Sequence, residues 1–517
     1  MEETSPENGI ERRSFLQKIG AAGLASGIGL SATGSVSALD DTRTTDWTRE
    51  QAERIQRTNA NTAPVIDDRV DKLTDDLYVW DTWPLRNRDG SITKVNGYQV
   101  IISLTSTDNV VPGARHNLAT LRYFYSKNGH DWELGGKVFE EPLGHHQWAG
   151  SAMYDQEEEQ LYSFYTAVSS SDLPPDERFR QRLVFGKGGS LETSSDGVEI
   201  TGEFDHYEIA EADGEMYQTL EQSVDQGIVY GFRDPWYFQH PETGEDYVLF
   251  EGNTPIEDPS AYPKDWESWN GNVGIAKATN DEMTEWELQQ PIVEAITTNQ
   301  QLERPHLVVN DGKYYLFTIS HKFTFAPGLD GPDALYGFVA DSLHGDYEPL
   351  NDGGLVVANP EEQPFQAYSW LALPQGDDAL ITSFLNFTDL DGKSLKDVGA
   401  LPPEQQKEVF GGTLAPSLKM QLNGTETKIT AELQDGQFLP SAGGTGNKCG
   451  NGNDDRGSEN DGHGNEDGDS GSGNENGNPG NGSGNGDSGS GNGNGDSGSG
   501  NGNGGRGGGS GYYGNGN

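Results

Sequence analysis

The chain has 517 residues with 83 acidic and 34 basic side chains, which gives a formal net charge of −49. This charge excludes nucleic acid as a partner, because no basic surface is left to neutralise phosphates. It favours adaptation to high salt, where self-repulsion is screened, over an ordinary acidic secreted protein. The single cysteine, Cys449, excludes an internal disulfide and any metal site made of several cysteines.

The first residues have the pattern of an export signal. Arg12 and Arg13 precede a mildly apolar run over residues 19–30, and residues 35–38 offer a cleavage site made of small side chains. This pattern predicts a twin-arginine signal peptide over residues 1–38 and therefore a secreted, extracellular protein. A single membrane anchor is the alternative, but the run is too short and too weakly apolar to span a bilayer, and no later segment is better suited.

Composition separates the rest of the chain into three parts. Residues 39–70 form a polar lead-in, and residues 71–440 carry the apolar patterns of a folded domain. Residues 441–517 contain no Leu, Ile, Val, Met, Phe or Trp, so we expect this tail to be disordered. Glycine repeats that bind calcium need an aliphatic residue in each copy, which this tail lacks.

Within residues 71–440, a pattern of three elements recurs. Apolar, aromatic-rich runs follow turns rich in Gly, Asp or Asn, at residues 98–104, 162–168, 247–250, 315–319 and 379–385. Just upstream of these runs lie segments that mix polar and aromatic residues, with Asp81, Ser151, Asp234, Glu303 and Tyr368 at corresponding points. Segments around Trp132, Trp286 and Tyr347 resemble one another as a later, outer element.

Five similar units of short antiparallel strands predict an all-β fold, a five-bladed β-propeller. A lectin-like sandwich is the alternative, but it would not explain repeats of this length with a polar first strand each time. In a propeller the first strand of every blade lines the central channel. We therefore expect Asp81, Asp234 and Glu303 to meet in one central funnel although they are far apart in the chain.

Three carboxylates in an aromatic-walled funnel suit the cleavage of a glycosidic bond. That reaction needs one acid to protonate the leaving oxygen and one carboxylate to act at the oxocarbenium-like centre, with their pKa values tuned apart. Arg233 is expected to keep Asp234 ionised, and Arg304 to change the proton affinity of Glu303. Each of these short motifs is common by itself, but their placement at corresponding points of the repeats favours a catalytic site.

The motifs VWDTWP, QWAGSA, FRDPWYF and LERPHLVV resemble those of the levansucrase and inulosucrase family, glycoside hydrolase family 68, from about residue 75 to residue 440. The resemblance implies a retaining, two-step transfer of a fructosyl group from sucrose. Asp81 then matches the nucleophile, Glu303 the acid/base, and Asp234 the residue that stabilises the transition state.

The resemblance also assigns residues around the three acids. Those matching the shell that holds fructose are Trp80, Trp148, Ser151 and Arg233, and Glu251 matches a carboxylate behind that shell. Those matching the glucosyl or acceptor side are Gln301, Arg304, His321 and Tyr368.

Two departures concern acceptor preference and metal binding. One branch of the family has a glutamate and an arginine where this chain has Gln301 and His321, so this chain follows the other branch. Gln300 stands where the first branch carries a calcium-binding aspartate, so we expect no metal and no other cofactor. The expected partners are sucrose and fructan or other sugar acceptors, while the oligomeric state stays open.

The leading hypothesis is an exported fructosyltransferase that makes fructan or fructooligosaccharides and releases glucose. Levan-type and inulin-type linkages remain equally open, because loop positions decide which acceptor hydroxyl reaches the intermediate. One alternative is a β-fructofuranosidase that hydrolyses sucrose. Another is a carbohydrate-binding propeller without turnover, whose acids only recognise hydroxyl groups.

Overall fold

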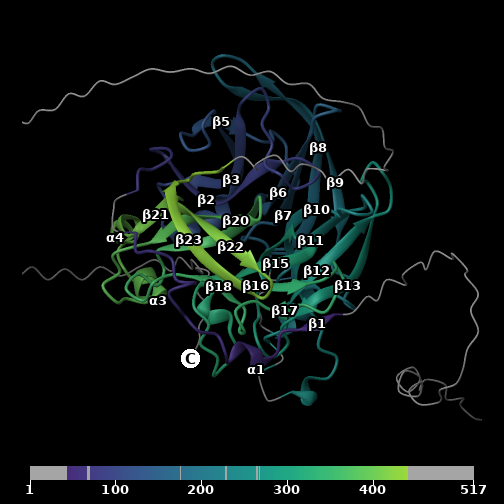
Figure 1. The fold of residues 1–517 in the computed structure, drawn as a ribbon, viewed down its shortest axis with the longest axis vertical. Coiled ribbons are helices and arrows are strands. Elements are labelled where there is room, and N and C mark those ends of the chain that lie inside the picture. Colours follow the sequence, from purple (N-terminus) through teal and green to yellow (C-terminus); the bar gives the residue numbers. More distant parts are fainter. Residues whose placement is uncertain are drawn as a thin grey trace, which may run out of the picture. The chain divides into compact units, whose positions relative to one another are not determined.

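The computed structural model describes residues 44–66, 70–174, 176–226, 230–262, 266 and 268–439, which form an all-β fold with a few short helices (Figure 1). The expected signal peptide over residues 1–38, the start of the lead-in and the tail from residue 441 lie outside the described residues. In the part of the chain that is described, no helix is both long enough and apolar enough to cross a membrane.

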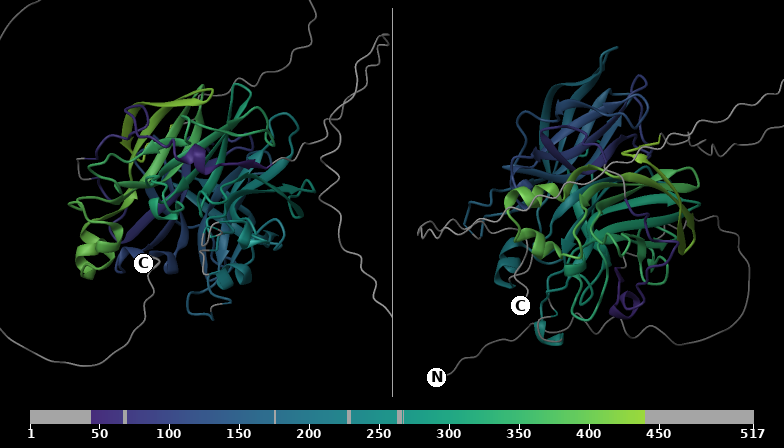
Figure 2. Two further views of the ribbon diagram at one scale, coloured as in Figure 1. Left: turned by 90° about the horizontal axis from the view of Figure 1, so that it is seen from below. Right: turned by 90° about the vertical axis from the view of Figure 1, so that its left-hand side faces the viewer.

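The largest sheet has eight strands in the order β5-β4-β3-β2-β6-β7-β8-β9. It consists of two antiparallel groups of four, which meet through a short parallel pairing of Leu85 with Ala152 and Arg86 with Met153. The strands are β2 (Leu77–Arg86), β3 (Gln99–Thr107), β4 (Thr120–Ser126), β5 (Glu133–Lys137), β6 (His146–Asp155), β7 (Gln160–Val168), β8 (Gln181–Thr193) and β9 (Val198–Ala210). Figure 2 shows the long β8–β9 hairpin projecting beyond its neighbours.

Three further sheets follow in chain order. The first contains β10 (Arg233–Gln239), β11 (Asp246–Asn253), β12 (Gly271–Ala278), β13 (Trp286–Glu294) and β1 (Thr45–Asp46). The second contains β14 (Glu303–Asn310), β15 (Lys313–Ser320), β16 (Ala334–Ala340), β17 (Glu348–Pro349) and β18 (Leu355–Ala358). The third contains β19 (Ala367–Gln375), β20 (Asp378–Phe387), β21 (Phe410–Leu414), β22 (Pro416–Asn423) and β23 (Glu426–Asp435).

The helices are short and connect the strands. They are α1 (Arg49–Ala52), α2 (Leu220–Gln226), α3 (Leu395–Gly399) and α4 (Pro403–Glu408), with 3-10 turns η1 (Pro112–Leu118), η2 (Pro259–Ala261) and η3 (Lys322–Thr324). Two of the 3-10 turns, η1 and η3, lie beside the candidate site described below.

The structure confirms the all-β prediction and the recurring elements. The aromatic-rich runs form the second strands of the five antiparallel groups, β3, β7, β11, β15 and β20, and these strands are largely buried. The later elements fall on the outer strands β5, β13 and β17. The first strands β2, β6, β10, β14 and β19 contact one another in that order, and β19 also contacts β2.

A β-bulge at the same place in each first strand positions the site. One extra residue on the first strand interrupts its pairing with the second strand. The last paired residues before the bulges are Trp80, Trp148, Arg233, Glu303 and Tyr368, and those that follow are Asp81, Ala149, Asp234, Arg304 and Ser369. Asp81, Asp234, Arg304 and Ser369 have φ of 50°, 64°, 47° and 57°. Such left-handed residues are uncommon and gather at functional sites.

The bulges show which residues of the five first strands are equivalent, and this differs from the equivalence that spacing predicted. Asp81 and Asp234 do occupy the same position, but Glu303 and Tyr368 lie one residue before it. Ser151 lies two residues beyond the equivalent position, which Ala149 occupies. The prediction was wrong by one or two residues because the number of residues between a polar segment and the next apolar run does not fix the register in which the two strands pair.

The polar lead-in packs on the sheets from residue 45 onward. β1 pairs in parallel with β13, joining Thr45 to Val293. Trp47 is buried among the rings of Phe325, Tyr336 and Phe338, with centroid distances of 5.8, 5.5 and 5.4 Å. The packed part of the chain therefore starts earlier than the boundary at residue 71 that composition predicts.

Candidate active site

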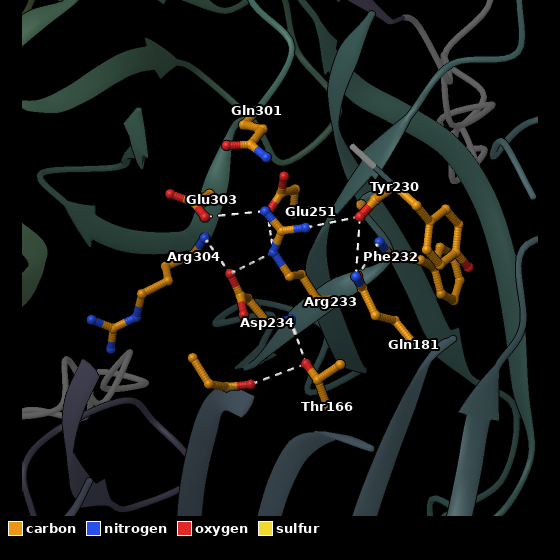
Figure 3. A network of polar contacts seen from close by, with 12 residues as sticks. Thr166, Gln181, Tyr230, Phe232, Arg233, Asp234, Glu251, Gln301, Glu303 and Arg304 are labelled. Carbon is orange, nitrogen blue, oxygen red and sulfur yellow. Dashed lines mark hydrogen bonds and ion pairs between the residues drawn. The ribbon is translucent and has the colours of Figure 1, made fainter. Parts of the chain in front are cut away.

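Arg233, the first residue of β10, holds two glutamates at one place (Figure 3). Its Nε lies 2.9 Å from Glu251 Oε2, and its Nη2 donates to Glu303 Oε1 over 3.0 Å. Nη1 donates to the backbone oxygen of Tyr230 over 3.1 Å. The guanidinium is buried, so these ion pairs are screened little by solvent. One arginine thus brings together acids from β11 and β14.

Asp234 follows Arg233 in the bulge and ties three first strands together. Its Oδ2 accepts the backbone N–H of Arg304 over 3.0 Å, and its own N–H donates to Thr166 Oγ1 over 2.8 Å. The Thr166 hydroxyl donates in turn to the carbonyl of Ala149. Burial, together with the charges of Glu303 and Asp81, raises the pKa of Asp234 to about 6 against the effects of Arg233 and Arg304.

Asp81 joins the same cluster through Arg304 and Ser369. The Arg304 guanidinium donates to the carbonyl and hydroxyl oxygens of Ser369 over 2.8 and 2.7 Å, and to the carbonyl of Thr82 over 3.1 Å. Burial raises the pKa of Asp81, whereas Arg304 and a hydrogen bond from Ser369 act in the opposite direction. The three acids that the sequence singled out therefore lie together.

Glu303 and Glu251 share Arg233 but differ in proton affinity. Burial raises the pKa of Glu303, but Arg233, His321 and the Tyr368 hydroxyl outweigh it and hold that pKa below its ordinary value. The Tyr368 hydroxyl donates to Glu303 Oε2 over 2.6 Å. Glu251 is fully buried, and burial raises its pKa well above the ordinary value despite Arg233. A proton held by this pair resides on Glu251, because only Glu303 reaches the surface.

His321 and Tyr368 form one wall of the site. Their rings stack with centroids 3.9 Å apart and an interplanar angle of 14°. His321 Nδ1 donates to Asp333 Oδ2 over 2.7 Å, and Asp333 also accepts the backbone N–H of Lys322 over 2.8 Å. Burial lowers the pKa of His321, but Asp333 and Glu303 outweigh it and raise that pKa.

A second part of the site includes residues that sequence reasoning missed, Arg115 and His116 of η1. The His116 ring lies edge-on to Trp80 and Trp148, with centroids 5.6 and 6.2 Å away. The His116 carbonyl accepts the indole N–H of Trp148 over 3.1 Å. Arg115 lies 5.3 Å from the Trp80 ring centroid. The segment lies between a second and a third strand, outside the recurring elements, which is why the repeats did not reveal it.

Two predicted binding residues, Trp80 and Ser151, are fully buried and pack beneath the site. Trp80 is fully buried, so in this conformation it packs against η1 and has no surface for a sugar. Ser151 is also fully buried. Its hydroxyl donates to the Pro235 carbonyl and accepts the Tyr237 N–H, which fixes β10 beside β6.

Gln301 and Arg304 lie on different sides of the acids. The backbone of Gln301 is held by Ser320, whose hydroxyl donates to its carbonyl over 2.6 Å. Its side chain lies near Glu251 and Glu303 in Figure 3, whereas the guanidinium of Arg304 extends away from Glu303 toward the bulges of β2 and β19. Within the described residues, no group of three or more His, Cys, Asp or Glu side chains is arranged to hold a metal ion.

Comparison with models of protein families shows the family to which the chain belongs. The model of glycoside hydrolase family 68, described as Levansucrase/Invertase, matches residues 37–439. The chain belongs to this family. The match contains every strand of the sheets and all three clustered acids.

Individual relatives agree with the family model. A solved structure, inulosucrase from Halalkalicoccus jeotgali bound to kestose, is 48% identical with a TM-score of 0.74, covering 78% of this chain and 98% of that one. An extracellular sucrase of Zymomonas mobilis is 35% identical over 416 residues, covering 77% of this chain and 95% of its own length. A levansucrase of Rahnella aquatilis is 34% identical over 430 residues, covering 77% and 96%.

Proposed function

We propose that this protein is a sucrose-dependent fructosyltransferase, which moves the fructosyl group of sucrose to sugar acceptors and releases glucose. Membership of family 68 and relatives named levansucrase and inulosucrase support the activity. The observation that carries the proposal is the network around Arg233 and Arg304, which joins Asp81, Asp234 and Glu303.

In the first step, the Asp81 carboxylate attacks the anomeric carbon of the fructosyl group as its bond to the glucosyl oxygen breaks. Glu303 gives its proton to that oxygen, so glucose leaves as a neutral sugar. Glu303 is ionised in the free site, so it takes up a proton from solvent as sucrose covers its exposed part, because loss of water raises a carboxyl pKa. Asp234, ionised, stabilises the positive charge that develops on the fructosyl ring.

In the second step, an acceptor hydroxyl attacks the anomeric carbon and the ester bond to Asp81 breaks. Glu303 takes the proton of that hydroxyl, so Asp81 is again a carboxylate and Glu303 is again protonated, as both were when sucrose was bound. A sugar acceptor gives an elongated product, whereas water gives free fructose. The related inulosucrase was solved with kestose, and linkage analysis of the product made from sucrose distinguishes levan from inulin.

We also propose the finer features that the sequence predicted. The contacts of β2, β6, β10, β14 and β19 in order, and of β19 with β2, support five blades around a central channel. The extracellular sucrase among the relatives supports secretion, for which the twin-arginine pattern is the proposed route. Of the remaining binding assignments, Tyr368 and His321 are supported by their place beside Glu303, and Trp148 by its place at the bulge of β6.

Substitution of the nucleophile tests the catalytic assignment. Asp81→Asn should lower glucose release from sucrose by at least about a thousandfold, since the covalent step is lost. Asp75→Asn, which changes an exposed carboxylate just before β2, is the matched control and should keep full activity. Circular dichroism should show both variants folded. Unchanged glucose release by Asp81→Asn would exclude this residue as the nucleophile and favour a binding protein or another acid.

Product analysis separates transfer from hydrolysis. On concentrated sucrose, the wild-type protein should release more free glucose than free fructose, because part of the fructosyl groups enters larger sugars. Equal amounts of the two at every sucrose concentration would contradict transfer and identify the protein as a β-fructofuranosidase.

A further inference from the structure

Three stacked rings lead outward from the proposed acid/base. The Tyr368 hydroxyl donates to Glu303, the His321 ring stacks on Tyr368, and the Phe323 ring stacks on His321. The centroids of Phe323 and His321 are 4.9 Å apart, and their planes differ by 15°. Although His321 covers one face of Phe323, this residue is 56% exposed. The other face of an apolar ring is therefore open to solvent at the edge of the site.

Hydrogen bonds hold the residues on both sides of Phe323. Asp333, which is buried, accepts hydrogen bonds from His321 Nδ1 and from the backbone N–H of Lys322, so it holds the two residues before Phe323. The Thr324 hydroxyl donates to the His321 carbonyl over 2.8 Å. A preorganised surface loses little conformational entropy when a ligand binds, which is expected of a binding surface.

The place of this ring relative to Glu303 indicates what it would bind. In the second step the acceptor must put one hydroxyl against Glu303, because that carboxylate removes its proton. The rest of an acceptor sugar chain then has to lie beyond the site. The column from Tyr368 to Phe323 starts at Glu303 and ends at solvent, where the outer face of Phe323 is open. The C–H faces of sugar rings pack against such aromatic faces.

We propose that the outer face of Phe323 binds a sugar ring of the acceptor and favours sugar acceptors over water. This inference rests on the proposed fructosyl transfer and names one residue that determines its acceptor specificity. Water has no ring to stack, so the platform increases the fraction of fructosyl groups that is transferred. The same contact holds a growing fructan chain near the site between successive transfers.

Phe323→Ala and Phe323→Trp test this role, with kestose as the added acceptor. The readout is the fraction transferred, which is free glucose minus free fructose, divided by free glucose, so it does not depend on the overall rate. For Phe323→Ala, the kestose concentration that halves free fructose should rise about tenfold, the size expected for one lost aromatic contact. Phe323→Trp keeps a stacking face and should therefore keep the wild-type fraction transferred. Leu134→Ala is the control, because it removes another exposed apolar side chain, 44% exposed, from the outer strand β5.

The outcomes separate the two proposals. If Phe323→Ala keeps the wild-type fraction transferred and kestose dependence, the platform is excluded while fructosyl transfer stands. A loss of transfer in Leu134→Ala as large as in Phe323→Ala would also overturn it, because the effect would not be local. If the wild-type protein releases equal glucose and fructose even with kestose, fructosyl transfer itself fails, and the platform fails with it.

Discussion

Asp234 shows at the scale of one residue how the site balances charge. Arg233 and the Arg304 N–H stabilise its carboxylate, but burial and two neighbouring acids raise its pKa to about 6. In the proposed mechanism this residue must be ionised. Because the reaction also needs a proton on Glu303, whose pKa in the free site lies below its ordinary value, kcat/KM should rise as the pH falls toward about 6. It should stop rising below that pH, where the free enzyme protonates Asp234.

At neutral pH, the ionised Asp234 should lower the stability of the protein although the proposed reaction needs it. A raised carboxyl pKa contributes stability below the unfolded-state value of 3.8, and this contribution is lost as the pH rises through about 6. Asp234→Asn should thus abolish glucose release yet raise the free energy of unfolding at neutral pH by up to about 3 kcal/mol. Calorimetry at neutral pH and below pH 4 checks this, since the gain should vanish where the wild-type residue is neutral. A lower melting temperature at neutral pH would contradict it.

Asp333 and His321 predict a pH dependence of stability with the same sign, at a different place in the site. It raises the pKa of His321, against the effect of burial, so the pair contributes stability below the unfolded-state histidine value of 6.5, and this stability is lost as pH rises through the folded-state value. Asp333→Asn should therefore destabilise the protein more at mildly acidic than at alkaline pH. Denaturant unfolding at the two pH values measures the difference. Equal destabilisation at both would show that Asp333 acts only through packing and its bond to the Lys322 N–H.

At the scale of elements, the bulges explain how flat strands present catalytic groups. One extra residue turns the backbone at Asp81, Asp234, Arg304 and Ser369 into the left-handed region. Such a conformation costs about 1–3 kcal/mol for a residue other than glycine, so surrounding bonds must hold it. Thr166 is one of these supports, since it accepts the Asp234 N–H and donates to the carbonyl of Ala149 in the neighbouring bulge.

Thr166→Val should remove this support while keeping the shape of the side chain. The two lost hydrogen bonds leave buried polar groups unpaired, which should lower the free energy of unfolding by about 1–3 kcal/mol. It should also lower kcat, because Asp234 is then poorly held. Thr318→Val is the matched control: Thr318 is fully buried, and its hydroxyl has no hydrogen-bond partner within the described structure. Unfolding curves and sucrose kinetics compare the two, and equal effects would contradict the supporting role of Thr166.

At the scale of the whole molecule, the large net negative charge determines how stability depends on salt. With a net charge of −49, the acids repel one another unless salt screens them. The screening length falls from about 10 Å at 0.1 M to about 3 Å at 1 M salt. The melting temperature should therefore rise by several degrees between these concentrations at neutral pH. The rise should be smaller near pH 4.5, where many surface carboxyls are protonated. A melting temperature independent of salt would contradict adaptation to high salt.

Sequence patterns alone determined the all-β class, the recurring strands and the identity of the three clustered acids. Apolar runs after turns reveal strands because burial selects them locally. The acids were found because their motifs recur at similar points of the units and resemble those of a known family.

Tertiary structure alone decided which of the neighbouring residues face the acids. Spacing placed Ser151 at the point that Ala149 occupies, and it missed His116 beside Trp80 and Trp148. A bulge changes the direction of a side chain without changing the composition of the strand, and η1 reaches the site only because β3 and β4 carry it there. Direction and proximity depend on contacts between segments far apart in the chain, which local patterns do not contain.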